Sequence, residues 1–127
     1  MQEQATETAS SESLRQPFID ITVDSWRFAK VFARLVERLE PTEASRYANQ
    51  LRYFLKKLDD SAAKAGVKIV SFEGQAYNAG LPATPLNLDE FGPDEHLVVD
   101  QMVEPVLMGP EGLIKSGTVT LRLAEKS

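Results

Sequence analysis

The chain has 127 residues, no cysteine, 43% apolar residues and a net charge of −5. It is long enough for one modest domain, or for two small units that need a partner to bury their apolar surface. The lack of cysteine excludes disulfides and thiolate metal sites. No apolar run approaches a membrane span, and the first sixteen residues lack the basic-then-apolar order of a signal peptide, so we expect a cytoplasmic protein without membrane association.

Charge is distributed unevenly along the chain. Residues 24–66 carry nine basic and six acidic side chains, whereas residues 67–127 carry four basic and nine acidic ones. Such a polarity can orient a charged partner. Because the basic residues are interspersed with Glu37 and Glu40 and the whole chain is acidic, nucleic acid is not an expected partner.

The N-terminal region is polar. Residues 1–17 contain few large apolar side chains and cannot bury enough surface to offset their ordering entropy, so they are predicted to form a disordered tail. The stretch from Phe18 to Val23 alternates partly between apolar and polar residues, which suggests a short strand or an extended lead-in.

Residues 18–66 are predicted to contain a helical hairpin. Asp24 or Ser25 can cap the first helix. Pro41 either ends that helix or marks the first turn of the next one, and Gly66 ends the second helix. The apolar residues of the first helix recur every three or four positions and form one stripe, expected to be its packing face: Phe28, Val31, Phe32, Leu35, Val36 and Leu39.

The second helix repeats its apolar residues with a period near 3.5. Two helices joined by a short link form an antiparallel hairpin, which leaves apolar surface uncovered. Pairing two hairpins into a dimeric four-helix bundle buries that surface. The predicted dimerisation residues are Leu51, Phe54, Leu55 and Leu58.

Residues 67–127 are predicted to form a small β domain, which makes the chain an α+β protein. Val67 to Phe72 and Leu97 to Met108 are rich in β-forming residues, and Pro105 lies near the end of the second run, a position that confines a proline to an edge or a bulge. Gly109 to Gly112 is a plausible hairpin turn leading into an alternating strand from Gly117 to Leu123. Residues 76–93, with three prolines and two glycines, are predicted to be an irregular loop.

A short motif follows the second predicted helix, consisting of Gly66-Val67, an isoleucine at position 69, Gly74 and Tyr77. It resembles the region where the helical bundle of GrpE-type nucleotide exchange factors meets their β domain. Val103, Gly112 and the strand from Gly117 are similar to the closing β segment of that family. The resemblance covers about residues 28–123.

The resemblance implies a homodimeric co-chaperone that promotes nucleotide release from a DnaK-type or actin-like ATPase. Such a protein favours the open state of its partner because it binds that state better, and it needs no catalytic residue, metal or cofactor. The alternative is a non-enzymatic adaptor or structural subunit of a larger assembly. The alternative is favoured by the absence of the family's long N-terminal stalk helix and by Lys115-Ser116-Gly117 in place of its Arg-Pro-Ala signature.

The remaining motifs give little support to an enzyme. His96 is the only histidine and lies among carboxylates on a predicted loop, which is more typical of a surface histidine than of a metal ligand. The chain has neither a Walker-type phosphate loop nor a GxGxxG turn. Apolar residues on the irregular loop, two methionines beside Pro105 and one arginine are the predicted partner-binding residues: Leu86, Leu88, Phe91, Met102, Met108 and Arg122.

Overall fold

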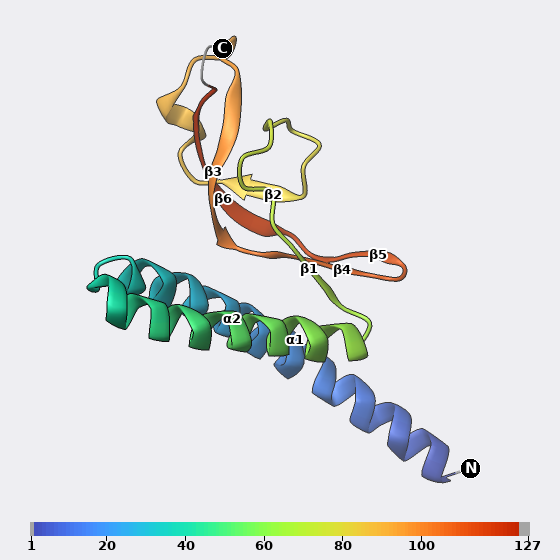
Figure 1. Cartoon of the computed structure of the whole chain (residues 1–127). Coiled ribbons are helices and arrows are strands. Elements are labelled where there is room, and N and C mark those ends of the chain that lie inside the picture. The colour runs from blue at the N-terminus through green and yellow to red at the C-terminus, as the bar shows by residue number, and fades with distance from the viewer. Residues whose placement is uncertain (1, 125–127) are drawn as a thin grey trace. The chain divides into compact units, whose positions relative to one another are not determined.

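The computed structural model describes residues 2–124, with side chains from Ser13 onward. As predicted, the chain is an α+β protein in which two helices precede a set of short strands (Figure 1). It divides into two compact units, with the boundary inside the second helix between Leu58 and Asp59. We call them the hairpin unit and the β unit. Neither helix of the described residues has the length and apolar character needed to cross a membrane.

Helix α1, Gln2–Val36, is longer than the sequence predicted. The backbone of residues 2–17, predicted as a tail, continues the helix, and the side chains of residues 13–17 are all exposed. The prediction of a strand or extended segment from Phe18 to Val23 is wrong, because these residues are helical. Asp24 and Ser25 lie inside the helix and do not cap it.

One face of α1 is buried, but it shares only Val36 with the predicted stripe. The hydroxyl of Thr22 on this face donates to the carbonyl of Phe18 at 2.7 Å, so the buried polar group has a partner. Three members of the predicted stripe, Phe28, Val31 and Leu35, are instead exposed. The buried residues of α1 are Ile19, Thr22, Val23, Trp26, Ala29 and Val36.

Helix α2, Pro41–Lys64, begins at the predicted proline, whose fixed φ suits the first turn of a helix. It runs back alongside α1 within the hairpin unit, and this confirms the predicted helical hairpin (Figure 1). The rings of Phe32 and Tyr47 join the two helices edge to face, with centroids 6.3 Å apart.

Gly66 ends α2 as predicted. It adopts a φ of 76°, a conformation that glycine accepts without steric cost. The amide of the buried Val67 donates to the carbonyl of Ala62 at 2.9 Å, which closes the last turn of the helix. The chain then enters β1, Lys68–Val70, within the predicted strand.

The strands form two three-stranded sheets. The first has the order β1-β4-β5, where β4 is Val106–Gly109 and β5 is Gly112–Lys115. The second has the order β2-β6-β3, where β2 is Ala83–Pro85, β3 is Leu97–Glu104 and β6 is Gly117–Leu123. The predicted hairpin turn is confirmed, with Gly112 at a φ of 119°.

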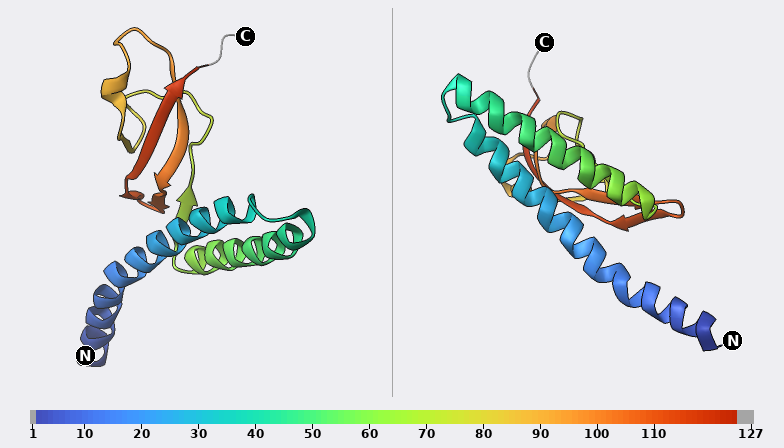
Figure 2. Two further views of the ribbon diagram at one scale, coloured as in Figure 1. Left: turned by 90° about the vertical axis from the view of Figure 1, so that its left-hand side faces the viewer. Right: turned by 60° about the horizontal axis from the view of Figure 1, so that its bottom comes forward.

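The two sheets are joined by one bent pair of strands. β3 passes into β4 at Pro105, and β5 passes into β6 at Ser116, so both strands change sheet at the same level (Figure 2). Gly117 permits this close approach, because a Cβ atom there would lie 2.7 Å from the carbonyl oxygen of Glu104. The core of the β unit is built around the bend from Val99, Met102, Pro105, Val106, Leu107, Val119 and Leu121.

The predicted irregular loop contains regular elements. β2 pairs in parallel with β6, and the short 3₁₀ helix η1, Leu88–Glu90, follows it. Upstream, Gly74 donates to Val99 and Tyr77 donates to Leu97, both at 2.9 Å, so residues 74–77 run along β3. Gly66, Gly74 and Tyr77 therefore lie at turns and backbone hydrogen bonds that lead the chain from the end of α2 to β3.

Candidate interaction surfaces

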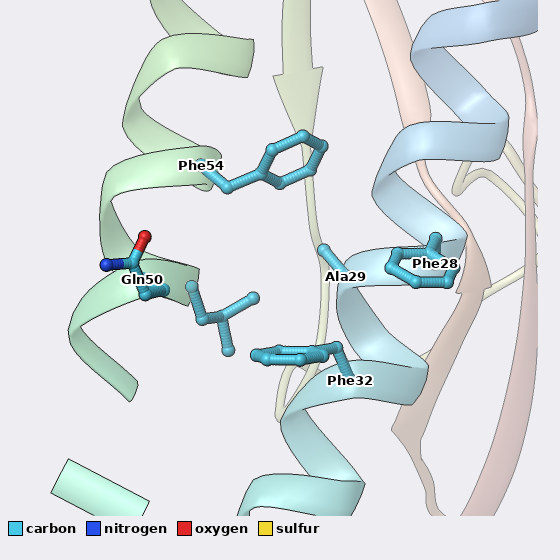
Figure 3. A pocket seen from close by; sticks show the side chains of 6 residues that line it. Phe28, Ala29, Phe32, Gln50 and Phe54 are labelled. Atoms are coloured by element: carbon cyan, nitrogen blue, oxygen red, sulfur yellow. The ribbon is translucent and has the colours of Figure 1, made fainter. Parts of the chain in front are cut away.

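The hairpin unit contains an apolar groove between its two helices. Phe28, Ala29 and Phe32 of α1 line it together with Gln50, Leu51 and Phe54 of α2, and its volume is about 240 Å³. Figure 3 shows Phe32 and Phe54 extending from opposite helices into the space between them. We call these six residues the hairpin groove. Because its lining is almost entirely apolar, the groove is suited to an apolar side chain.

The four predicted dimerisation residues lie along the side of α2 that packs in the hairpin. Leu51, Leu55 and Leu58 are half-buried within the single chain, whereas Phe54 is exposed. Leu51 and Phe54 line the hairpin groove. Three of the four predicted dimerisation residues are thus partly covered within the single chain. Phe54 is the most exposed of the four and has the most surface available for contact with a second chain.

A second apolar feature of the hairpin unit was missed by the sequence analysis. Leu14, Ile21, Phe28 and Leu35 lie along the outside of α1 and are 57–68% exposed. We call them the outer stripe. The sequence places Leu14 in the predicted tail, Ile21 in the predicted extended segment, and only Phe28 and Leu35 in the predicted helix. The spacing of seven residues between successive members is the signal that could have identified the stripe.

The β unit presents two of the predicted partner-binding residues on a fixed loop. Leu86 and Leu88 are 58% and 46% exposed. We call them the leucine pair. The amide of Leu86 donates to the carbonyl of Val119 at 2.9 Å. Between the leucines, the side chain of Asn87 donates to the carbonyl of Leu121 at 3.0 Å and accepts from its amide at 2.8 Å.

Asn87 thereby acts as an extra strand residue beside β6. Its amide group replaces the two backbone partners that a neighbouring strand would supply, so the loop is held at a defined position. Asn87 also donates to the carboxylate of Glu90 at 3.3 Å, which ties it to η1. The leucines were predicted from the sequence, whereas the role of Asn87 as their anchor was not.

The other predicted partner-binding residues have different environments. Phe91 and Met108 are half-buried. Met102 is 2% exposed and belongs to the core, so its prediction as a contact residue is wrong. Arg122 is exposed on the polar face of β6, where its Nε lies 3.4 Å from Oδ1 of Asp100 across the β3–β6 pair.

Met108 borders a wide depression of the β unit, between the last turns of α2 and the β4–β5 turn, with a volume of about 610 Å³. Asp59 and Asp60 lie on its helical side and Lys68 on its β side. Partial burial raises the pKa of Asp59 above its ordinary value, and the neighbouring charge of Asp60 raises this pKa further.

Among the residues whose side chains the structure describes, 13–124, no three His, Asp or Glu side chains are grouped so that they could hold a metal ion. The side chain of His96 is exposed, as predicted for a surface histidine, and its backbone carbonyl accepts a hydrogen bond from Ala124 at 2.9 Å.

Comparisons of the chain with models of protein families, with curated proteins and with solved structures found no match.

Proposed function

We propose that the protein is a non-enzymatic interaction module of the GrpE-like kind. In this proposal it forms a homodimer through its helices and promotes nucleotide release from a DnaK-type or actin-like ATPase in the cytoplasm. The β unit contacts the ATPase, and the hairpin unit joins the two copies.

The observation that carries the proposal is the leucine pair, whose two side chains are exposed on a loop held by hydrogen bonds to β6. Exposed apolar side chains gain free energy when a partner covers them. Because the loop is already ordered, little conformational entropy is lost on binding, and more of that free energy contributes to affinity. Fixed apolar residues of this kind are suited to be the anchors of an interface.

Charge around the leucine pair indicates what kind of surface it fits. Asp89, Glu90, Asp94 and Glu95 follow it closely in the chain, and residues 67–127 are acidic as a whole. A complementary partner surface has an apolar pocket with a basic rim, which would also speed association through electrostatic steering.

Two features of the fold support the GrpE-like version of this proposal. α1 extends for 35 residues, so the argument from a missing N-terminal helix no longer favours the adaptor alternative. The motif residues also lie where they determine the path of the chain, with Gly66 ending α2 and Gly74, at a φ of 83°, turning toward β3.

Release follows from differential binding. A module that binds the open, nucleotide-free ATPase more tightly than the closed, loaded state shifts the partner toward the open state by the ratio of the two affinities. Nucleotide and module then weaken each other's binding by the same factor. No group on the module has to take part in chemistry.

The test is the affinity for a purified DnaK-type ATPase, measured by calorimetry with the partner nucleotide-free and ADP-loaded. We expect binding at least about tenfold tighter to the nucleotide-free state, a difference of about 1.4 kcal/mol. Leu86→Ser combined with Leu88→Ser should weaken binding to both states. Leu113→Ser is the matched control, because Leu113 is an equally exposed leucine in the other sheet.

The two candidate functions give different results in this experiment. Equal affinity for both nucleotide states, still sensitive to the leucine pair, would favour a constitutive adaptor or structural subunit. Affinity that is insensitive to the leucine pair but lost with Leu113→Ser would contradict the assigned surface.

A further inference from the structure

The outer stripe of α1 repeats with a strict spacing of seven residues. Leu14, Ile21, Phe28 and Leu35 occupy equivalent positions of successive heptads, and each is more than half exposed. Val31, three residues after Phe28, is also exposed and widens the stripe. At a rise of 1.5 Å per residue the stripe is about 32 Å long.

A seven-residue repeat is the pattern by which a helix contacts another helix along its whole length. On a straight helix the repeat drifts by about 20° per heptad, and two helices that supercoil around each other keep it in contact. Within the hairpin unit, however, the side of α1 that lines the groove with α2 carries Ala29 and Phe32, and of the outer stripe only Phe28 reaches the groove. The outer stripe thus has the pattern of a helix contact and is left exposed by its own chain.

The two flanks of the outer stripe differ in chemistry. At 100° per residue, Asp20, Asp24, Arg27 and Arg34 project along one flank. The acidic members lie toward the N-terminal end and the basic members toward the C-terminal end. The opposite flank carries Phe18 and Phe32, both half-buried, and Phe32 faces the hairpin groove.

We propose that the outer stripe is the contact between two copies of this chain, whose α1 helices pair in antiparallel orientation. In the pairing that sets Leu14 against Leu35, Ile21 lies against Phe28 of the second copy. Each copy thus contributes the same four apolar residues, as a two-fold contact requires. Phe28 also lines the hairpin groove, so the proposed contact is continuous with it.

The charged flank favours the antiparallel orientation. In an antiparallel pair the charged flank of one helix faces the charged flank of the other, which sets Asp20 and Asp24 about 3 Å along the axis from Arg27 of the second copy. Both helices contribute these attractive contacts, so they outnumber the single like-charge approach of the two Asp24 side chains, which lie almost opposite each other. A parallel pair instead sets the charged flank against the flank of Phe18 and Phe32, which desolvates charges beside apolar rings. The antiparallel pair places the two apolar flanks, and with them the two hairpin grooves, on the same side.

This inference rests on the dimer that the proposed function includes. Its tests measure mass and helix orientation, however, and not nucleotide release. Either proposal can therefore fail while the other stands.

The first test is the mass in solution by light scattering over a range of concentrations. We expect a dimer for the wild type and an increase of at least tenfold in the dimer dissociation constant for Ile21→Asp or Phe28→Asp. Circular dichroism checks that the helices remain, which is expected because both side chains are exposed. Leu113→Asp, at an exposed leucine of the β unit, should leave the mass unchanged. A wild type that stays monomeric would overturn the proposal.

The second test reverses the charges. A variant with Asp20→Arg and Asp24→Arg should dimerise poorly, and so should one with Arg27→Asp and Arg34→Asp. An equimolar mixture of the two should form a heterodimer, because every close charge pair is then attractive. Failure of the mixture to associate would contradict the assigned flank.

The third test fixes the orientation and uses the absence of cysteine from the chain. Under mild oxidation, neither Leu14→Cys nor Leu35→Cys alone should form a disulfide-linked dimer. A mixture of the two should form one, since these positions oppose each other only in the antiparallel pair. Self-linking of either single variant would indicate a parallel pair and overturn the proposal.

Discussion

The hairpin unit and the β unit differ in how completely their central elements bury their apolar residues. In the β unit, Val99, Val106, Leu107 and Val119 are each completely buried around the bend between the sheets. In the hairpin unit, Phe28, Val31 and Leu35 are more than half exposed, although they belong to the same regular apolar pattern that predicted the helix. The β unit completes its core within the chain, whereas the hairpin unit leaves large apolar side chains of α1 exposed.

The difference indicates a division of roles. A unit with a closed core can hold a loop at a defined position, as the β unit holds the leucine pair through Asn87. Two helices alone cannot enclose their apolar surface and are completed by further helices. We therefore expect the stability of the hairpin unit to depend on protein concentration, whereas that of the β unit does not.

Removing matched leucine side chains should give the largest difference between the units. Leu107→Ala leaves a cavity in the closed core and should lower the free energy of unfolding of the β unit by about 3 kcal/mol. Leu55→Ala removes a half-buried side chain and should cost about 1 kcal/mol. Hydrogen exchange resolved by peptide measures the two units separately. Equal losses of hydrogen-exchange protection in Leu107→Ala and Leu55→Ala would contradict the proposed difference between the two units.

Adding one methyl group at the bend should also destabilise the β unit. In Gly117→Ala the new Cβ would lie 2.7 Å from the Glu104 carbonyl oxygen and 3.0 Å from Cγ2 of Val106, so the two strands must separate. We expect a loss of about 2 kcal/mol in urea unfolding. Gly92→Ala is the control, because its nearest neighbour is the side chain of Glu95 at 3.3 Å, which can move aside.

The anchor of the leucine pair should matter for both stability and binding. Asn87→Ala leaves the partly buried amide and carbonyl of Leu121 without the side chain that they bond, at a cost of about 1–2 kcal/mol. It should also weaken ATPase binding, although neither leucine is changed. Asn78→Ala removes one exposed hydrogen bond to the Gly80 amide and should affect both quantities less. Unchanged ATPase affinity in Asn87→Ala would argue against a preorganised loop.

The smallest effect should be electrostatic. Partial burial and then the charge of Asp60 raise the pKa of Asp59, so its ionised form is less favourable in the folded state than in the unfolded chain. The resulting cost is present at pH values above the raised pKa and disappears as the pH falls below the ordinary pKa of aspartate. Asp59→Asn should therefore raise the melting temperature slightly at pH 7 and not at pH 3. A stabilisation that persists at pH 3 would point to another cause.

The sequence predicted those parts of the fold in which local pattern and packing agree. The α2 helix, its glycine stop, the turn between β4 and β5 and the alternating strand from Gly117 were all predicted correctly. The sequence predicted a tail, an extended segment and a helix where the structure has the single helix α1, because the residues from Phe18 to Val23 have the local pattern of a strand. In the structure these residues are helical because the helix continues through them, which overrides their local propensity. β2 was missed because its proline-containing residues pair with a strand more than thirty positions away.

The candidate surfaces were predictable to a different extent. The leucine pair could be predicted from composition, because apolar residues on an irregular segment either pack against the protein or contact another chain. Asn87 could not be identified, because its role is defined by contacts with Leu121 that no local pattern reveals. Met102 and Leu86 are both apolar residues of the same region, and only the tertiary structure separates the buried one from the exposed one.

The most direct test of the proposed function is the rate at which fluorescent ADP leaves a DnaK-type ATPase, followed by stopped flow with and without the protein. We expect a release rate that increases with the concentration of the wild-type protein. The increase should be largely lost with Leu86→Ser and Leu88→Ser and kept with Leu113→Ser. Binding of the ATPase without any change in the release rate would contradict the exchange-factor function and leave the adaptor.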